Sequence, residues 1–463
     1  MFVGFDYGSA NCSVGIVIDG QVELLPLMDN SHYMPSTLYA YDRDLICQAV
    51  YQQLPVSDQA EYASLRAAQL SHAQRVRHEL DLSADEQAVF VGKQAQEHYL
   101  DMPEEGFYVR SPKSFLGATG LRQEQVALFE DIVTLMMMFV KKRIDHILAE
   151  KGLGKATHAV IGRPVNFQGI GGEQSNLQAE AILTTAATRA GFESVSFLFE
   201  PLAAGMDFES QLTSTQTVLV VDVGGGTTDC SVVKMGPNQS QTSDRKADCF
   251  GHSGQRIGGN DLDIALAMQG VMPHLGSTCQ LVTGKPLPKQ PFWNAVAVND
   301  ISAQRDFASL STKKLLDELV KDAVKPELIK RLQKVQRDQL GYQIVRQAEL
   351  AKIALSEHAS TQADLAFVEA DFTLDISLSQ FETAITTPLA QVESLMRQAV
   401  DAATESMSGR TSPDVVYVTG GTAKSPAIHQ KISAVYPEAQ LVVGDHFGSV
   451  TAGLTKWAQR VWY

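Results

Sequence analysis

Two short segments of the chain combine aspartate with a glycine-rich turn. The first is Asp6 followed by Gly8, Ser9, Ala10 and Asn11, and the second is Asp222 followed by Gly224, Gly225, Gly226, Thr227, Thr228 and Asp229. Backbone N–H groups in tight turns donate to phosphate oxygens, and carboxylates hold Mg²⁺, usually through its waters. Both segments are therefore predicted to bind a nucleoside triphosphate with its magnesium.

The residues around these turns predict the elements that position them. Each aspartate ends an apolar run typical of a buried strand, and each turn leads into a second strand that includes Cys-Ser-Val. Residues 2–14 and 218–232 thus form an internal repeat of two β-Asp-turn-β hairpins. We expect two like-folded lobes that face one another across a cleft, with Asp6 and Asp222 directed at the metal.

A third glycine turn lies near the end of the chain. Residues 415–426 read as an apolar strand, then Gly420, Gly421 and Thr422, then a helix that begins near Pro426. A fourth strand (441–445) and a closing helix (447–461) follow. Strands that alternate with helices predict an α/β architecture.

The segments between these motifs are helical in character. Residues 57–100 and 310–358 read as helical subdomains, and 121–151 as one amphipathic helix whose three consecutive methionines, 136–138, fill the core. Residues 234–250 contain a turn-rich loop.

The amino-acid composition excludes several classes of protein. The 463 residues exceed one ordinary core, and 44% hydrophobic with 20% charged residues excludes wholesale disorder. A net charge of −15 without a basic block argues against nucleic acid as a partner. The five cysteines are scattered, which fits a reducing compartment, and no basic residue precedes Arg43, so a signal peptide is not expected. No apolar run approaches the about 20 residues that a membrane span needs. We therefore expect a cytoplasmic protein that does not cross a membrane.

In order, these motifs resemble the ATPase domain of the DnaK-type heat-shock chaperones, in the actin, hexokinase and heat-shock superfamily. The segments that carry the resemblance are 3–16, 109–117, 199–205, 220–233, 255–266, 348–360, 417–433 and 446–455. The resemblance implies two actin-like (ribonuclease H-like) lobes flanking a nucleotide cleft. The first would span 1–212 with a peripheral subdomain at about 40–120, and the second 213–463 with a helical one at about 255–372.

The resemblance also implies a role for each matching residue, with ATP or ADP and Mg²⁺ as cofactors. Asp6, Asp222 and Asp229 would orient the magnesium. Lys113, Glu200, Asp229 and Thr227 would be catalytic. The nucleotide would be bound by Gly8, Ser9, Ala10, Asn11, Gly224, Gly225, Gly226, Thr227, Thr228, Glu349, Lys352, Ser356, Gly420, Gly421, Thr422 and Lys424.

The chain departs from the family pattern at three positions of the predicted nucleotide site. Ala10 lacks a hydroxyl that the family has, and Ile353 and Lys424 replace a pair of arginines that stack on adenine, so we expect altered base recognition. Because the chain stops soon after the closing helix, we expect no peptide-binding domain, and the chain then resembles the short YegD-type homologues.

The sequence therefore predicts a chaperone-like ATP-binding protein. It would hydrolyse ATP slowly with Mg²⁺, couple this to opening and closing of the lobes, and signal to a separate, unidentified protein partner or client. The alternatives are a small-molecule kinase on the same scaffold, a filament-forming actin-like ATPase, and a protein that binds nucleotide without hydrolysis.

Overall fold

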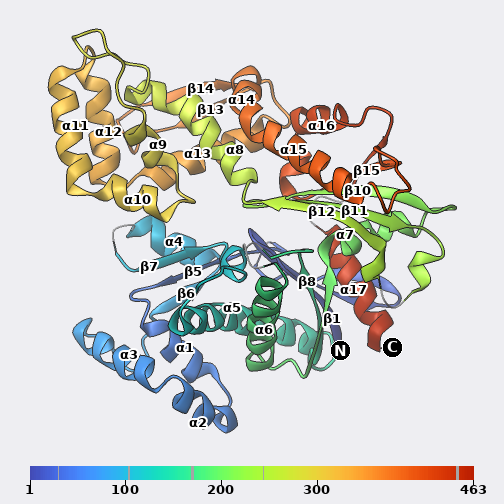
Figure 1. The fold of residues 1–463 in the computed structure, drawn as a ribbon. Helices are drawn as coiled ribbons and strands as arrows, with labels where there is room; N and C mark the ends of the chain where they lie inside the picture. The colour runs from blue at the N-terminus through green and yellow to red at the C-terminus, as the bar shows by residue number, and fades with distance from the viewer. Residues whose placement is uncertain (30, 103–104, 168–171, 243–244, 445–447, 463) are drawn as a thin grey trace. The chain divides into compact units, whose positions relative to one another are not determined.

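The chain folds into two compact units. A computed structural model describes residues 1–462, apart from residues 30, 103–104, 168–171, 243–244 and 445–447. Unit 1 comprises Met1–Arg256, Leu395–Ala423 and Val435–Tyr463, and unit 2 comprises Ile257–Ser394 and Lys424–Ala434 (Figure 1). The predicted lobe boundaries at 212 and 213 stay a prediction.

Unit 1 contains a first mixed sheet with the strand order β3-β2-β1-β8-β9, and β4 pairs with β2. The strands are β1 (Phe2–Tyr7), β2 (Asn11–Ile18), β3 (Gln21–Leu24), β4 (Met34–Pro35), β8 (His158–Arg163) and β9 (Ser194–Phe199). β1 pairs antiparallel with β2 and parallel with β8. Val3, Phe5 and Tyr7 of β1 are fully buried, which explains the apolar run that precedes the first turn.

A second sheet in unit 1 has the same topology, with the order β12-β11-β10-β15-β16. Its strands are β10 (Gln216–Val223), β11 (Thr228–Met235), β12 (Cys249–Gln255), β15 (Val415–Thr419) and β16 (Gln440–Val443). β10 pairs antiparallel with β11 and parallel with β15, as β1 does with β2 and β8. The two predicted β-Asp-turn-β hairpins are confirmed, and they occupy equivalent places in two like sheets.

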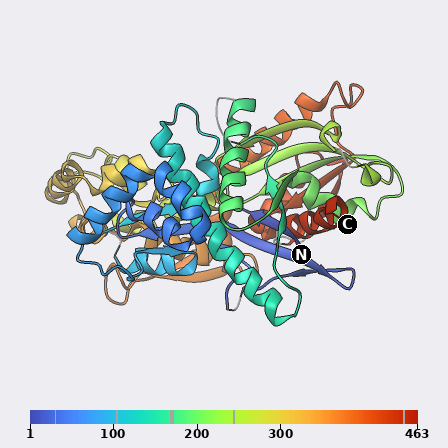
Figure 2. The same ribbon diagram turned by 90° about the horizontal axis from the view of Figure 1, so that it is seen from below.

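Helices of unit 1 pack against these sheets. They include α5 (Gln123–Glu150), α6 (Glu173–Arg189), α7 (Glu200–Glu209) and the closing helix α17 (Ser449–Trp462). Gly4 of β1 lies so close to α17 that a Cβ there would be 2.2 Å from the backbone nitrogen of Thr455. The Phe2 and Trp462 rings stack with centroids 5.9 Å apart, and the ends of the chain lie side by side (Figures 1 and 2).

The predicted helix at 121–151 is confirmed as α5, and Met136 and Met137 are fully buried in the core. No helix among the described residues is both long and apolar enough to cross a bilayer.

A smaller three-stranded sheet with four helices also belongs to unit 1. Its order is β6-β5-β7, and its elements are β5 (Thr37–Ala40), β6 (Val89–Val91), β7 (Phe107–Arg110), α1 (Leu45–Gln53), α2 (Val56–Leu65), α3 (Ala67–Glu79) and α4 (Lys93–Asp101). The purely helical interpretation of 57–100 was wrong at β6. That strand has three residues and forms by pairing with β5, a partner about 50 residues earlier.

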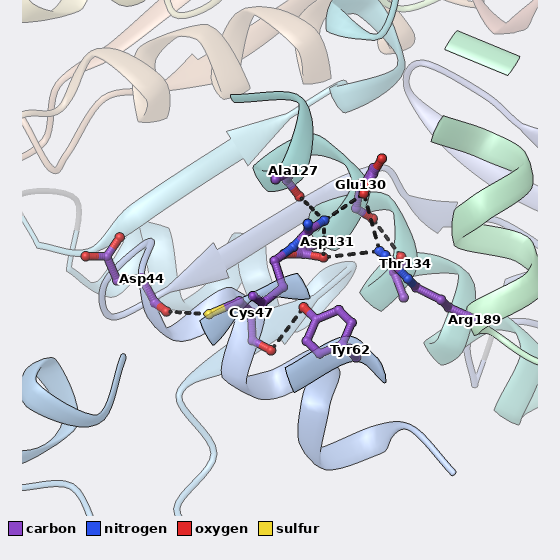
Figure 3. A network of polar contacts seen from close by, with 9 residues as sticks. Asp44, Cys47, Tyr62, Ala127, Glu130, Asp131, Thr134 and Arg189 are labelled. Atoms are coloured by element: carbon purple, nitrogen blue, oxygen red, sulfur yellow. Dashed lines mark hydrogen bonds and ion pairs between the residues drawn. The ribbon is translucent and has the colours of Figure 1, made fainter. Parts of the chain in front are cut away.

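A buried ionic network joins α5 to this region (Figure 3). Nε of Arg66 donates to Oδ2 of Asp131 at 3.0 Å, and Nη2 of Arg66 donates to Oε2 of Glu130 at 2.6 Å. Arg189 of α6 donates to Oδ1 of Asp131 at 3.4 Å. Arg66 and Asp131 are 4% and 2% exposed, so each charge depends on its partner.

Unit 2 is mainly helical. Its longer elements are α8 (Gly259–Leu266), α9 (Gln290–Val296), α10 (Ile301–Ala308), α11 (Leu310–Asp322), α12 (Pro326–Arg337), α13 (Gly341–Ala354), α14 (Leu378–Ala384), α16 (Pro426–Ser433) and the hairpin β13 (Ser360–Asp364) and β14 (Thr373–Ser377). α15 (Thr386–Ala403) begins in unit 2 and ends in unit 1. The predicted helical character of 310–358 is confirmed by α11, α12 and α13.

Candidate nucleotide-phosphate site

Five charged side chains from separate elements of unit 1 interact electrostatically. We call these five side chains the charge cluster. They are Asp6 on β1, Lys113 on the short 3₁₀ helix η1 (Pro112–Phe115), Glu200 at the start of α7, Asp222 on β10 and Asp229 on β11. Asp222 and Asp229 are direct neighbours across the second hairpin. The two repeated sheets, η1 and α7 therefore bring together five residues that the sequence assigned to one site.

Lys113 is the single cation of the charge cluster. It is 6% exposed, and its Nζ donates to Oε1 of Glu200. Burial by itself lowers the pKa of Lys113, but the negative charges of Glu200 and Asp6 outweigh burial and raise the pKa above its ordinary value. Lys113 is therefore charged at neutral pH.

The three aspartates have strongly perturbed acidities. Burial, followed by the charge of Glu200, raises the pKa of Asp6 and of Asp222 to about 7. Burial, Glu200 and Asp222 raise the pKa of Asp229 to about 8. Full ionisation of four carboxyl groups around one lysine would leave an excess of negative charge, and a bound cation would favour that ionised state.

The two glycine-rich turns meet. A Cβ atom on Gly225 would lie 2.6 Å from the Cβ of Ala10, so the turn after β10 reaches the turn after β1 only because residue 225 has no side chain. Ser36 supports the first turn: its hydroxyl donates to the Gly8 carbonyl at 2.6 Å, and its N–H donates to the Ala10 carbonyl at 2.9 Å. In the second turn the Gly224 N–H donates to the Thr227 carbonyl at 2.9 Å.

Other residues predicted for these turns are placed as follows. Ser9 and Gly226 lie in the turns, Asn11 begins β2, and Thr228 begins β11 with its side chain fully buried. Thr227 lies just ahead of β11, and its side chain hydrogen-bonds Asp229.

The third glycine turn contacts the second. Gly420 has a φ of +93°, and a Cβ there would lie 2.4 Å from the Val223 carbonyl oxygen and 2.7 Å from Oδ1 of Asp222. The Thr422 hydroxyl donates to the Gly224 carbonyl at 3.1 Å. Gly421 begins the short 3₁₀ helix η6 (Gly421–Lys424). Residue 420 must therefore be glycine for two reasons. Its φ is positive, and a Cβ atom there would collide with the Val223 carbonyl and the Asp222 side chain.

The residues predicted to bind adenosine lie in unit 2. Glu349 and Lys352 are on α13, and Ser356 follows it. Nζ of Lys352 pairs with Oδ1 of Asp263 at 2.7 Å and donates to the Gly259 carbonyl at 3.3 Å. Their nucleotide role stays a prediction, as does that of Lys424, whose side chain lies outside the described part of the chain.

His252, which belongs to none of the motifs in the sequence, lies beside Asp229 of the charge cluster. On β12, its Nδ1 lies 3.2 Å from the Ser231 hydroxyl, and its Nε2 lies 3.9 Å from Oδ1 of Asp229. Burial lowers the pKa of His252 to about 4, so the ring is neutral at physiological pH. The contacts of His252 could not be predicted because the strand that carries it, β12, was not predicted. β12 contains two glycines, which are uncommon in strands.

Within the described residues, no three His, Cys, Asp or Glu side chains lie close enough together to hold a metal ion directly. Mg²⁺ keeps several waters and commonly binds proteins through one or two carboxylates together with substrate phosphates. The three aspartates suit that kind of coordination better than a closed protein cage.

Comparisons with known proteins agree with this geometry. The family model of the MreB/Mbl protein matches residues 109–248. Chaperone protein dnaK1 of Synechocystis sp. is 24% identical over 319 residues, which cover 67% of this chain and 36% of the relative. Chaperone protein DnaK of Thermus thermophilus is 33% identical over 130 residues, or 28% of this chain and 18% of the relative. The chain thus spans about a third or less of the length of these curated relatives.

The repeated sheets, the glycine turns and these matches define an α/β protein with the two-lobed fold of the actin-like ATPases. These matches support an actin-like ATPase domain of the Hsp70 type.

Proposed function

We propose that this protein binds ATP with Mg²⁺ and hydrolyses it slowly to ADP and phosphate. The observation that carries the proposal is the meeting of the Gly225 and Ala10 turns beside the charge cluster. The relatives named chaperone protein DnaK support a chaperone-like role, in which the state of the nucleotide is passed to an unidentified protein partner or client.

Some residues of the site bind the phosphates, and others supply charge to the reaction. The N–H groups of the two hairpin turns bind the phosphate oxygens, and the third turn positions the second one through Thr422. Asp6, Asp222 and Asp229 would hold the waters of Mg²⁺, which when bound would offset part of the charge of the triphosphate. Lys113 keeps its positive charge and places it at the γ-phosphoryl, where charge stabilisation contributes more than a strong base.

Glu200 has a positioning task. Its carboxylate accepts from Lys113, and it lies next to Gly162, where a Cβ would be 3.2 Å from Cγ of Glu200. Glycine at 162 therefore leaves the space that this carboxylate occupies. Opening and closing of the two lobes with nucleotide would follow from turns on two separate sheets sharing one ligand.

Phosphate release from ATP tests the proposal. The wild-type protein is expected to hydrolyse ATP only with Mg²⁺, and Asp222→Asn is expected to abolish turnover. Asp58→Asn on α2, an exposed carboxylate, is the matched control and should behave as wild type. Wild-type turnover in Asp222→Asn would contradict the assigned site.

Two further measurements separate the alternatives. Formation of ADP that rises many-fold with a sugar or an acid in a metabolite screen would favour a kinase, and ATP-dependent pelleting would favour a filament. Binding of ATP without release of phosphate would leave a nucleotide-binding protein.

A further inference from the structure

Arg256 contacts the segment that carries Lys113. It follows directly after β12, and its Nη2 donates to the Ser114 hydroxyl at 2.9 Å. The guanidinium carbon lies 4.6 Å from the centroid of the Phe115 ring, within the range of a cation–π contact. Ser114 and Phe115 are the two residues after Lys113. One exposed arginine therefore makes two separate contacts beside the buried lysine.

The segment around Lys113 has little structure of its own to fix it. η1 has four residues, and runs of 3₁₀ helix are short because their hydrogen bonds are poorly aligned. Ser111, just before it, has a φ of +57°, a left-handed conformation that is uncommon for residues other than glycine. Internal bonds include Ser114 N–H to the Ser111 carbonyl at 3.0 Å and the weaker Leu116 N–H to the Lys113 carbonyl at 3.3 Å. Contacts with other parts of the chain must therefore help to fix the conformation of this segment.

Two contacts to Phe115 supply part of that order. Phe115 stacks on Phe129 of α5, with ring centroids 6.0 Å apart and an interplanar angle of 8°. This contact ties η1 to the helix that packs on the first sheet. Arg256 extends from the strand at the edge of the second sheet, 142 residues further along the chain than Ser114. The lysine segment is thus held from both halves of unit 1.

We propose that Arg256 is a positioning residue for Lys113, holding η1 through the Ser114 hydroxyl and the face of Phe115. The inference rests on the proposed ATPase activity for its functional part, but the contact itself can be tested without nucleotide. A planar guanidinium makes both contacts at once, whereas the ammonium group of a lysine has no plane to stack. Along the chain, Arg256 is the last residue of unit 1 before unit 2 begins at Ile257.

The test uses the full chain and four variants. Arg256→Ala removes both contacts, and Arg256→Lys keeps the charge but not the stacking plane. Ser114→Ala removes the hydroxyl, and with it the bond that this hydroxyl donates to the Ser111 carbonyl at 2.7 Å. Arg43→Ala is the control, since its side chain is 68% exposed and it pairs only weakly with Asp44 at 3.6 Å. Hydrogen exchange of the amides at 112–116 is measured in the nucleotide-free protein, and kcat and ATP affinity are measured separately.

Arg256→Ala is expected to speed exchange of the 112–116 amides and to lower kcat about tenfold while ATP affinity stays within about twofold. Arg256→Lys and Ser114→Ala should fall between wild type and Arg256→Ala in both measurements. Arg43→Ala should match wild type.

Several outcomes would overturn the inference. Unchanged exchange at 112–116 in Arg256→Ala would show that the arginine does not hold the segment. A loss of affinity as large as the loss of kcat would make Arg256 a ligand contact instead. If Arg256→Ala does not fold, wild-type exchange and kcat in both Arg256→Lys and Ser114→Ala would overturn the inference. A wild-type protein without turnover would instead refute the proposed function, and the exchange data would still decide whether Arg256 holds the segment.

Discussion

Substitution of Gly225 by alanine would push the two glycine turns apart. The new Cβ would lie 2.6 Å from the Cβ of Ala10, whereas carbon atoms in contact prefer about 3.5–4.0 Å. One turn must therefore move by about 1 Å. The φ of Gly225 is outside the left-handed region, so the penalty comes from the contact and not from the backbone.

The size of the effect follows from the cost of overpacking. Extra methyl groups in a packed site cost about 1–3 kcal/mol, which corresponds to a loss of about 5- to 150-fold in ATP affinity if the displaced turn binds phosphate. Ala10→Gly removes the opposing methyl group, and the nearest remaining atom, the Cα of residue 10, would lie 3.8 Å from the new Cβ. The double variant Ala10→Gly with Gly225→Ala should therefore recover most of the lost affinity.

Calorimetric titration of ATP with Mg²⁺ measures both variants. Gly270→Ala in unit 2 is the control, because its Cβ would have no neighbour closer than 3.6 Å. Wild-type affinity in Gly225→Ala, or no recovery in the double variant, would refute the inference that the two turns meet at a phosphate site.

Three further predictions concern charge. Lys113→Ala should leave ATP affinity within several-fold but slow phosphate release by at least tenfold, and equal losses in both would make the lysine a binding contact in the ground state. The three aspartates have pKa values raised to about 7–8, so the folded protein binds more protons than the unfolded chain between about pH 4 and pH 8, and their contribution to stability is lost as the pH rises through that range. In EDTA the melting temperature should fall from pH 6 to pH 8.5 and Mg²⁺ should raise it more at pH 8.5, whereas a Mg²⁺ effect that is equal at both values would contradict the assignment. Arg66→Ala should destabilise the fold by about 3–5 kcal/mol in urea unfolding, because it leaves Asp131 buried with a weaker partner, and a change below about 1 kcal/mol would show that the network is not strongly coupled.

The elements predicted best from the sequence are those with local signals. A Val- and Phe-rich run that ends in Asp before a glycine turn specifies a hairpin within about 15 residues, so both hairpins were predicted. The 28-residue helix α5 was predicted because its apolar positions recur at helical spacing. The order of motifs also identified the five residues of the charge cluster.

Elements that depend on distant contacts were not predicted. β12 contains Gly251 and Gly254, which disfavour a strand, yet a Cβ at Gly251 would lie 2.2 Å from the Ala399 carbonyl oxygen, so glycine is needed where α15 approaches the strand. Without β12, the contacts of His252 and Arg256 could not be inferred. The pairing of Arg66, the residue between α2 and α3, with Asp131 of α5 joins positions 65 residues apart in the chain, and in the sequence both charges look like ordinary solvated ones.

We propose above that the repeated hairpins of unit 1 bind one metal-bound triphosphate. The most direct measurement is a calorimetric titration of the wild-type protein and Asp222→Asn with ATP, each with Mg²⁺ and with EDTA. We expect the wild-type protein to bind ATP more tightly with Mg²⁺ than with EDTA, and Asp222→Asn to lose that difference. Wild-type protein that does not bind ATP, or equal Mg²⁺ dependence in both proteins, would contradict this proposal.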